Sequence, residues 1–314
     1  MRVAHTAAEL FEHAELFEAA PERGDKRTKR AVVMTMGALH EGHLALVRAA
    51  REMADEVVVT VFVNPLQFND QGDLERYPRN LDADCALLEP LGVDVVFAPS
   101  VDEMYPGGEP FVRVNAGAFN DVFEGAFRPG HFDGVLTVVL KLLNLTRPAV
   151  ALFGQKDAQQ FIAIKAMCMD LSVPVEIAAI PTVRDEDGLA LSSRNVFLSA
   201  DERADALALS RALRESGQVL DEGGSLALAL AVGRAALAEV PGVAVDYLAA
   251  LHPATAQPVA DDYRGDVTIA VAARVGETRL IDNIAARVGL RNGVTDSTAP
   301  EPTAPEPTTT EGDS

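Results

Sequence analysis

The chain has 314 residues, 48% of them hydrophobic and 24% charged, and this composition is ordinary for a globular protein with a substantial core. Its formal net charge of −20 repels phosphate backbones and anionic lipid, which argues against general binding to nucleic acid or to a membrane surface. The same acidity means that any site for a polyanion must be a local cluster of basic side chains.

The cysteines and the N-terminal segment predict a cytoplasmic protein. Cys85 and Cys168 lie far apart and form no CxxC pattern, so reduced thiols are expected. The N-terminal stretch MRVAHTAAELFEHAELFEAA carries charges throughout and lacks the apolar core of a signal peptide. No run approaches the roughly 20 apolar residues that a membrane-spanning helix needs.

The first half of the chain alternates short β-branched runs with helical stretches. Strands are expected at Ala31–Thr35, Val57–Val63, Val93–Ala98, Ala149–Phe153 and Val175–Ile180. Helices are expected between them, at Gly42–Ala54, Asp84–Leu91, Val135–Leu145 and Gln159–Leu171. Such alternation, with strands that are apolar on both sides, predicts an α/β fold with a Rossmann-like, doubly wound parallel sheet over residues 1–183.

The second half has a different pattern. Helical periodicity dominates Ala200–Glu239, and Val243–Ala250 and Val267–Val275 have the composition of strands. This predicts a second, smaller α+β C-terminal domain over residues 184–290. Residues 291–314 consist mainly of Pro, Thr, Ser, Ala, Gly and acids, which predicts a disordered tail.

The segment Thr35–His43, TMGALHEGH, joins the first buried strand to its helix. Ligands of open parallel sheets bind at the carboxyl ends of strands, where the N-termini of helices favour anions. His40 and His43 are three residues apart and face the same side of an entering helical turn, and Gly42 permits close backbone approach. This HxGH pattern resembles that of the nucleotidyltransferase superfamily. The alternatives are a zinc site, which would need a third ligand, and two ordinary surface histidines.

Two further segments carry donors that suit an anion. FGQKDAQQ follows an apolar strand, so Lys156 can reach a phosphate and Gln160 can bind a carboxylate or hydroxyl. GLALSSRN contains Ser192 and Arg194 in a polar loop. Each segment has a plainer interpretation, as a solvated helix start and as a helix cap respectively.

Taken together, these motifs resemble the pantothenate synthetase (pantoate–β-alanine ligase) family from about residue 5 to residue 290. Five further blocks of the chain contribute to the resemblance, namely FVNPLQF, RYPR, RPGHFDG, PTVR and TRLIDN. Eight blocks in family order are far more specific than any single motif. Met34, Ala83, Ala158 and Leu191 depart from the usual family residues.

The resemblance implies roles for particular residues. His40, His43, Lys156 and Arg194 correspond to catalytic residues that hold the triphosphate, and Gln67, Gln160 and Asn64 to residues that bind pantoate. The nucleotide contacts correspond to Thr35, Met36, Gly42, Gly154, Asp157, Val183, Leu191 and Ser192. Asp84 corresponds to an aspartate associated with Mg²⁺. Arg128 and His131 lie in a loop near the site with a less definite role.

The activity that the resemblance implies is an ATP-dependent condensation of pantoate with β-alanine through a pantoyl-adenylate, with release of AMP and pyrophosphate. The expected partners are these small molecules and a second copy of the chain in a homodimer. A nucleotidyltransferase that stops at a nucleotide-linked product shares the first motif but leaves Gln67 and Gln160 without a role. A non-catalytic paralogue is disfavoured because His40, His43, Lys156 and Arg194 are all present.

Overall fold

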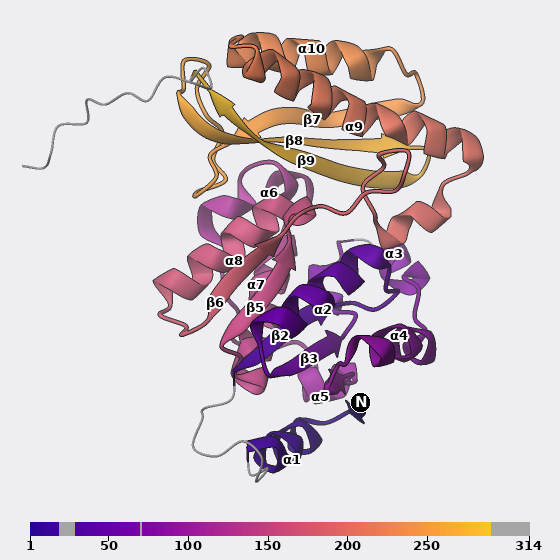
Figure 1. Ribbon diagram of the computed structural model, residues 1–314, viewed down its shortest axis with the longest axis vertical. Helices are drawn as coiled ribbons and strands as arrows, with labels where there is room; N and C mark the ends of the chain where they lie inside the picture. The colour runs from indigo at the N-terminus through magenta and orange to yellow at the C-terminus, as the bar shows by residue number, and fades with distance from the viewer. Residues whose placement is uncertain (19–28, 70, 290–314) are drawn as a thin grey trace, which may run out of the picture.

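The computed structural model describes residues 1–18, 29–69 and 71–289, and the tail predicted at 291–314 lies outside these ranges. Its N-terminal part is built around a parallel sheet in the order β1-β4-β3-β2-β5-β6 (Figure 1). The strands of this sheet are β1 (Arg2–Ala4), β2 (Arg30–Thr35), β3 (Glu56–Val61), β4 (Val95–Phe97), β5 (Val150–Gly154) and β6 (Glu176–Ile180). All of their pairings are parallel, which confirms the predicted doubly wound fold.

Alternate residues of the central strands point to opposite faces of the sheet, and both faces are covered. Val32 and Val58 belong to one apolar core, whereas Val33 and Val59 belong to another on the opposite side. The helices around this sheet are α1 (Ala7–Glu18), α2 (Glu41–Met53), α3 (Gln71–Arg76), α4 (Leu81–Leu88), α5 (Val101–Met104), α6 (Glu124–Phe127), α7 (His131–Thr146) and α8 (Ala158–Asp170). A short 3-10 turn, η2 (Pro65–Gln67), follows β3 after three residues, and another, η5 (Gln155–Asp157), follows β5 directly.

The C-terminal part forms a separate antiparallel sheet with two helices on its outer face (Figure 1). Its strands are β7 (Val243–Leu251), β8 (Gly265–Val275) and β9 (Thr278–Val288). They pack with α9 (Ala200–Asp221) and α10 (Leu226–Ala238) around a core of their own, which confirms the smaller α+β unit. The 3-10 turn η6 (Ser193–Phe197) precedes α9.

Most predicted elements are present with small shifts at their ends, but some elements were not predicted. Neither β1, α1 nor β9 was predicted, because β1 has only three residues and β9 contains polar side chains on its buried side. The helix predicted at Asp84–Leu91 begins earlier, at Leu81, since Asn80 caps it by accepting from the Ala83 amide. The domain boundary at 183/184 falls in the connection between β6 and α9 and remains a prediction.

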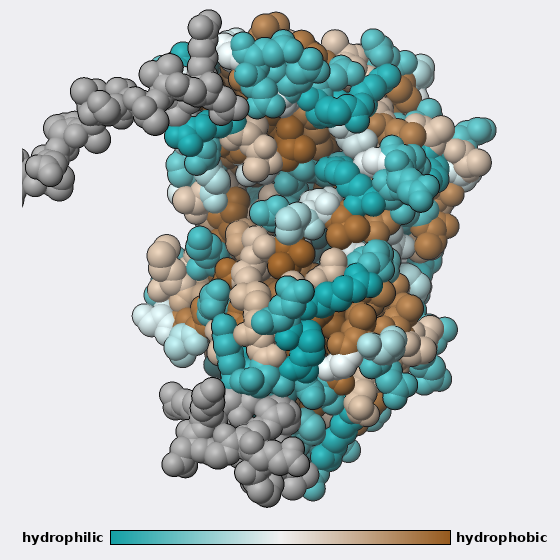
Figure 2. Space-filling model, viewed as in Figure 1, coloured by the Kyte–Doolittle hydropathy of each residue, from teal (hydrophilic) through white to brown (hydrophobic). Residues whose placement is uncertain are grey.

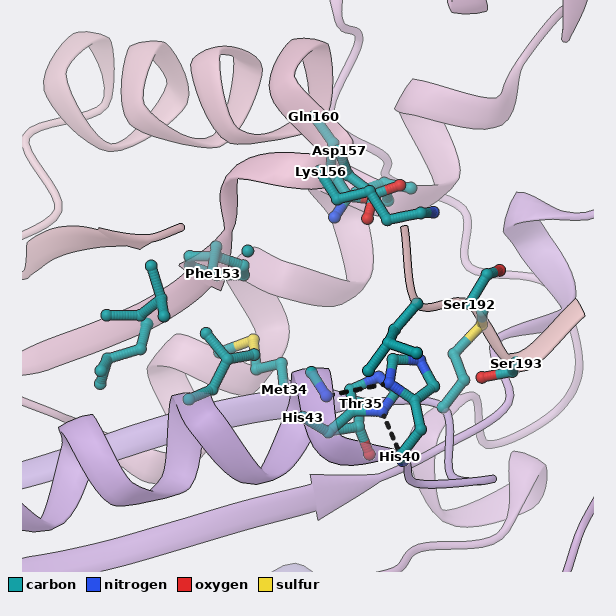
Figure 3. A pocket seen from close by; sticks show the side chains of 18 of the residues that line it. Met34, Thr35, His40, His43, Phe153, Lys156, Asp157, Gln160, Ser192 and Ser193 are labelled. Carbon is teal, nitrogen blue, oxygen red and sulfur yellow. Dashed lines mark hydrogen bonds between the residues drawn. The ribbon is translucent and has the colours of Figure 1, made fainter. Parts of the chain in front are cut away.

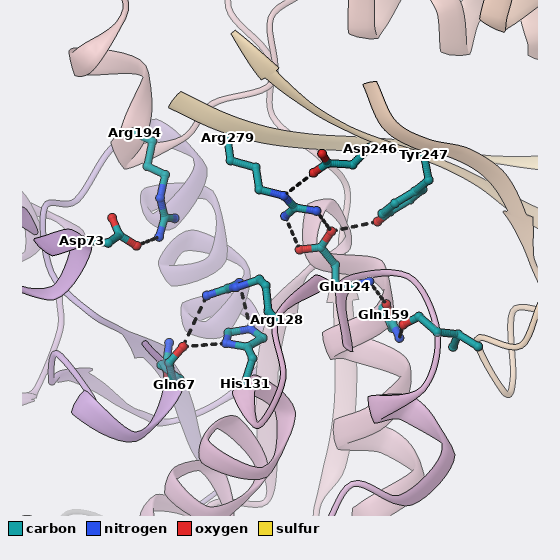
Figure 4. Close-up of polar contacts among 11 residues, drawn as sticks. Gln67, Asp73, Glu124, Arg128, His131, Gln159, Arg194, Asp246, Tyr247 and Arg279 are labelled. Atoms are coloured by element: carbon teal, nitrogen blue, oxygen red, sulfur yellow. Dashed lines mark hydrogen bonds and ion pairs between the residues drawn. The ribbon is translucent and has the colours of Figure 1, made fainter. Parts of the chain in front are cut away.

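A buried ion-pair network joins the two parts of the molecule. The guanidinium of Arg279 on β9 donates to both carboxylate oxygens of Glu124 on α6, each at 2.7 Å, and to Asp246 at 2.6 Å (Figure 4). The Tyr247 hydroxyl also donates to Glu124, at 3.0 Å. Burial alone would raise the pKa of Glu124, but the hydrogen bonds from Arg279 hold it below its ordinary value.

Hydrophilic side chains cover much of the face that Figure 1 presents, and separate hydrophobic patches interrupt them (Figure 2). Within the described ranges, none of the helices combines the length and the apolar character that crossing a membrane requires. The exposed hydrophobic residues include Phe111 and Val112, which lie between α5 and α7.

Candidate active site

A cavity of about 230 Å³ opens at the carboxyl ends of β2 and β5, where the order of the sheet reverses. From β2 the chain continues to β3 on one side, whereas β5 continues to β6 on the other, and ligands of doubly wound folds bind at such switch points. Every residue to which the sequence analysis gave a definite role, except Asp84, lines this cavity. These residues are Thr35, Met36, His40, Gly42, His43, Asn64, Gln67, Gly154, Lys156, Asp157, Gln160, Val183, Leu191, Ser192 and Arg194.

His40 and His43 lie side by side at the N-terminus of α2, with ring centroids 4.1 Å apart (Figure 3). Nδ1 of His40 accepts the Gly42 amide at 3.2 Å, and Nδ1 of His43 accepts the His40 amide at 3.3 Å. Because both Nδ1 atoms are acceptors, the proton of each neutral ring lies on Nε2. A Cβ at Gly42 would lie 3.0 Å from the His40 ring, so a larger residue there would crowd the imidazole.

Burial keeps both imidazoles neutral. It lowers the pKa of His43 to about 3, with further lowering by His40 and Lys156. The pKa of His40 falls to about 4, again mainly through burial, with a smaller contribution from Lys156. At neutral pH the pair therefore presents two uncharged N–H donors to the cavity rather than two cations.

Asp84 holds the loop that carries these histidines. Its carboxylate is buried and accepts the Ala38 amide at 3.1 Å and the Leu39 amide at 2.8 Å. Gly37 and Ala38 both have positive φ values, of 80° and 52°, so the loop adopts a backbone that needs such support. The predicted magnesium-associated residue thus lies behind the loop, not in the cavity wall, and its side chain acts on the site through the two amides.

The opposite wall comes from the turn after β5. Figure 3 shows Lys156, Asp157 and Gln160 across the cavity from the two histidines. In the part of the chain that the structure describes, no acidic side chain is paired with the Lys156 ammonium. The buried Gln159 points away from the cavity and fixes α6 by accepting the Glu124 amide.

The third wall is the segment before α9. Ser192 caps η6 by accepting the Arg194 amide, and Ser193 donates to the Ala38 carbonyl at 3.2 Å, which ties this segment to the histidine loop. The Arg194 guanidinium donates to Asp73 on α3 at 2.9 Å (Figure 4). This cation is therefore partly neutralised and would exchange a carboxylate for an incoming anion.

A polar platform follows β3. Asn64 is buried, and its amide donates to Gln67 Oε1 and to the Gly134 carbonyl, both at 3.1 Å. The carbonyl of Gln67 accepts His131 Nδ1 at 2.8 Å, while Arg128 donates to Nε2 of the same ring at 3.0 Å (Figure 4). Burial, then the Arg128 charge, lowers the pKa of His131 to about 3. This buried, neutral imidazole holds the turn that carries Gln67.

Apolar side chains form the floor of the cavity beside this platform. They come from β2, the end of β3, α7 and β5, and they are Met34, Phe62, Val135, Val138, Val139, Leu142 and Leu152. A ligand bound here would therefore meet hydrogen-bond donors on one side and a hydrocarbon surface on the other.

Several residues at the site had no assigned role in the sequence analysis. Tyr77 lines the cavity, Asp73 binds Arg194, and Asn283 on β9 donates to the carbonyls beside Lys156. Tyr77 belongs to the block RYPR and Asn283 to the block TRLIDN. Membership in these blocks was therefore the sequence signal that could have identified both residues. Asp73 lies outside those blocks, and its contact to Arg194 spans too many residues for any local pattern to reveal.

Fold and cavity together define a class: a Rossmann-type α/β protein with a pocket lined by hydrogen-bond donors at the switch point of its sheet. A family model described as Pantoate-beta-alanine ligase matches residues 3–285. A pantothenate synthetase of Streptomyces avermitilis is 51% identical over 311 residues, covering 83% of this chain and 93% of the relative. A pantothenate synthetase of Thermobifida fusca is 56% identical over 263 residues, covering 81% of this chain and 88% of the relative.

Solved structures agree with these sequence relatives. The pantothenate synthetase of Thermus thermophilus has a TM-score of 0.82 at 49% identity, covering 90% of this chain and 99% of its own. The pantoate-beta-alanine ligase of Francisella tularensis has a TM-score of 0.72 at 34% identity, covering 90% and 97%. The chain belongs to the pantoate-beta-alanine ligase family, and it is a ligase of pantothenate biosynthesis.

Proposed function

We propose that the chain joins pantoate to β-alanine in two steps that share this cavity. In the first step a carboxylate oxygen of pantoate forms a bond to the α-phosphorus of ATP, and the bond to pyrophosphate breaks. In the second step the free amine of β-alanine attacks the acyl carbon of the pantoyl-adenylate, and the bond to AMP breaks. The crystallised Francisella tularensis ligase is a complex with "Beta-gamma ATP and Beta-alanine", which supports two of these substrates.

The observation that carries this proposal is the convergence of donors from three distant segments of an acidic chain. His40 and His43 come from the loop after β2, Lys156 from the turn after β5, and Arg194 from η6. We assign their N–H groups to the triphosphate, where they would stabilise the charge that develops on the leaving pyrophosphate. The neutral histidines would donate from Nε2, and the two cations would supply the positive charge.

The remaining lining residues fit the other parts of the two substrates. Gln67 and Gln160, with Asn64 behind them, would bind the carboxylate and hydroxyls of pantoate, and the apolar floor would contact its two methyl groups. The rest of the nucleotide would lie against Thr35, Met36, Gly42, Gly154, Asp157, Val183, Leu191 and Ser192. Positioning two anions in line accounts for most of such catalysis, and no covalent nucleophile is required.

Magnesium enters this proposal as part of the MgATP substrate. Mg²⁺ is commonly held by substrate phosphates with one or two carboxylates. Among the described residues there is no group of three or more His, Cys, Asp or Glu side chains that could hold a metal ion. An all-protein metal cage is therefore not indicated among these residues, so the ion would arrive with the nucleotide and Asp84 would position the histidine loop.

We also propose that the protein works in the cytoplasm as a homodimer. Its thiols, Cys85 and Cys168, are free, which suits a reducing compartment. Phe111 and Val112 are almost completely exposed, and a second copy of the chain would remove them from water. Sedimentation at micromolar concentration should give the mass of two chains, and a single-chain mass would contradict this.

The decisive test is the exchange of labelled pyrophosphate into ATP in the presence of pantoate. His43→Ala and Lys156→Ala should abolish this exchange while the proteins remain folded. Lys165→Ala removes an exposed lysine from the same helix as Gln160 and should exchange like the wild type. Near-normal exchange in both site variants would refute the proposed site, and mass spectrometry of wild-type products should show AMP and pantothenate together.

A further inference from the structure

The strand β9 of the C-terminal domain reaches into the wall of the active site. Asn283 is buried there, and its side-chain amide donates to two successive carbonyls, those of Gln155 at 2.9 Å and Lys156 at 2.7 Å. Those carbonyls belong to η5, the turn that projects the Lys156 side chain into the cavity. A residue of the second domain therefore fixes the backbone of a catalytic turn in the first.

Asp282, the residue before Asn283, makes a similar contact to the segment that carries Val183. Both carboxylate oxygens of Asp282 accept the guanidinium of Arg184, at 2.6 and 2.9 Å, and Arg184 directly follows Val183 in the cavity wall. Asp282 Oδ1 also accepts a hydrogen bond from the backbone N–H of Asn283 at 2.8 Å, and this bond orients the strand at this point. One edge of β9 thus contacts two separate loops of the site.

We propose that Asn283 is a positioning residue for Lys156, so that the C-terminal domain sets where the ammonium meets the nucleotide. The Asn283 side-chain amide supplies two N–H donors from one nitrogen, one for each of the two adjacent carbonyls, without adding a charge. An aspartate of the same shape would place carboxylate oxygens against those carbonyls. This inference rests on the proposed role of Lys156 at the triphosphate.

The domain interface does not depend on this contact alone. Arg279 on β9 also binds Glu124 on α6, so a second, mostly buried contact joins β9 to the first domain. Loss of the Asn283 amide should therefore leave the protein folded while the turn at Lys156 shifts. Displacements of about 1 Å can reduce rates by about a hundredfold when groups must be held in line.

The test compares Asn283→Ala and the isosteric Asn283→Asp with a matched control in the same domain. Ser216→Ala is the control, because Ser216 is buried and donates to the Ala229 carbonyl at 2.9 Å inside the C-terminal core. We expect both Asn283 variants to lower kcat for pantothenate formation at least about tenfold. The urea midpoint of Asn283→Ala should match that of Ser216→Ala, whose kcat should stay near the wild-type value.

A double-mutant cycle on equilibrium binding of a non-hydrolysable ATP analogue separates positioning from general damage. Asn283→Ala should weaken binding in the wild-type background but have little further effect once Lys156→Ala has removed the side chain. Equal losses in both backgrounds, or a kcat within twofold of the Ser216→Ala control, would overturn the proposal. Because the cycle uses binding alone, it remains informative even if the adenylate intermediate is disproved.

Discussion

The carboxylate of Asp84 occupies the space that a side chain on residue 37 would need. A Cβ built on Gly37 would lie 2.9 Å from Asp84 Oδ2, and Gly37 has a φ of +80°. The same carboxylate binds the next two amides of the histidine loop. The shape of this loop therefore depends on a glycine and an acid that are 47 residues apart.

Gly37→Ala should destabilise the fold by about 3–5 kcal/mol, because it combines backbone strain with loss of the charge-assisted hydrogen bonds that the loop amides donate to Asp84. It should also lower activity, since His40 follows in the same loop. Gly107→Ala is the matched control: its φ is +83°, but a Cβ there meets nothing within 4 Å. That variant should lose only about 1–2 kcal/mol in urea unfolding. Equal losses for the two glycines would show that Asp84 does not set this loop.

Stability should fall as the pH drops below about 6.5 because of the buried histidines. His43 and His131 have pKa values near 3 in the folded protein, against 6.5 ordinarily. Unfolding between these values takes up protons, so the free energy of unfolding falls by up to about 1.4 kcal/mol per pH unit for each ring.

His131→Gln keeps a donor beside the Gln67 carbonyl but cannot take up a proton. Urea unfolding between pH 6 and pH 4 should therefore show a shallower loss of stability than the wild type, by up to about 1.4 kcal/mol per pH unit. Above pH 7.5 the two proteins should differ by a constant amount. Parallel curves across the acid range would mean that His131 is protonated in the folded state.

Asp73→Asn should strengthen ATP binding, because Arg194 would no longer have to exchange a carboxylate for a phosphate. The ion pair is partly exposed, so the change should be modest, up to about 1 kcal/mol or fivefold in Kd. Calorimetric titration with a non-hydrolysable ATP analogue measures this change in Kd. Arg194→Ala, which removes the guanidinium, should weaken binding of the same analogue. Weaker binding by Asp73→Asn would instead show that the carboxylate orients the guanidinium for the nucleotide.

Glu124→Gln should cost about 1.5–3 kcal/mol, because it removes the buried carboxylate that accepts two hydrogen bonds from Arg279 and leaves only Asp246 to balance that charge. Differential scanning calorimetry should show the loss as a lower Tm. Arg287 lies on β9, like Arg279, but its ion pair with Asp266 is exposed. Arg287→Ala should therefore cost less than about 1 kcal/mol. If the two variants melted alike, the network at Glu124 would not stabilise the contact between the domains.

The sequence alone determined the α/β class, the positions of the buried strands along the chain and the candidate donors of the site. These are local properties: continuous apolar runs mark the strands, and strand-to-helix junctions such as TMGALHEGH and FGQKDAQQ mark the carboxyl edge of the sheet. His40, His43, Lys156 and Arg194 could be found because their residue types suit a polyanion and their segments follow a family pattern.

Only the tertiary structure decided what holds those side chains in place. Asp84 turned out to support a loop from behind, His131 to fix the Gln67 turn, and Asn283 to bind the turn of Lys156 from another domain. Each contact joins residues far apart in the chain, and its geometry depends on how whole sheets and helices pack. No local sequence pattern encodes such distances. The sequence could therefore predict which residues are the donors, but not which residues hold them in position.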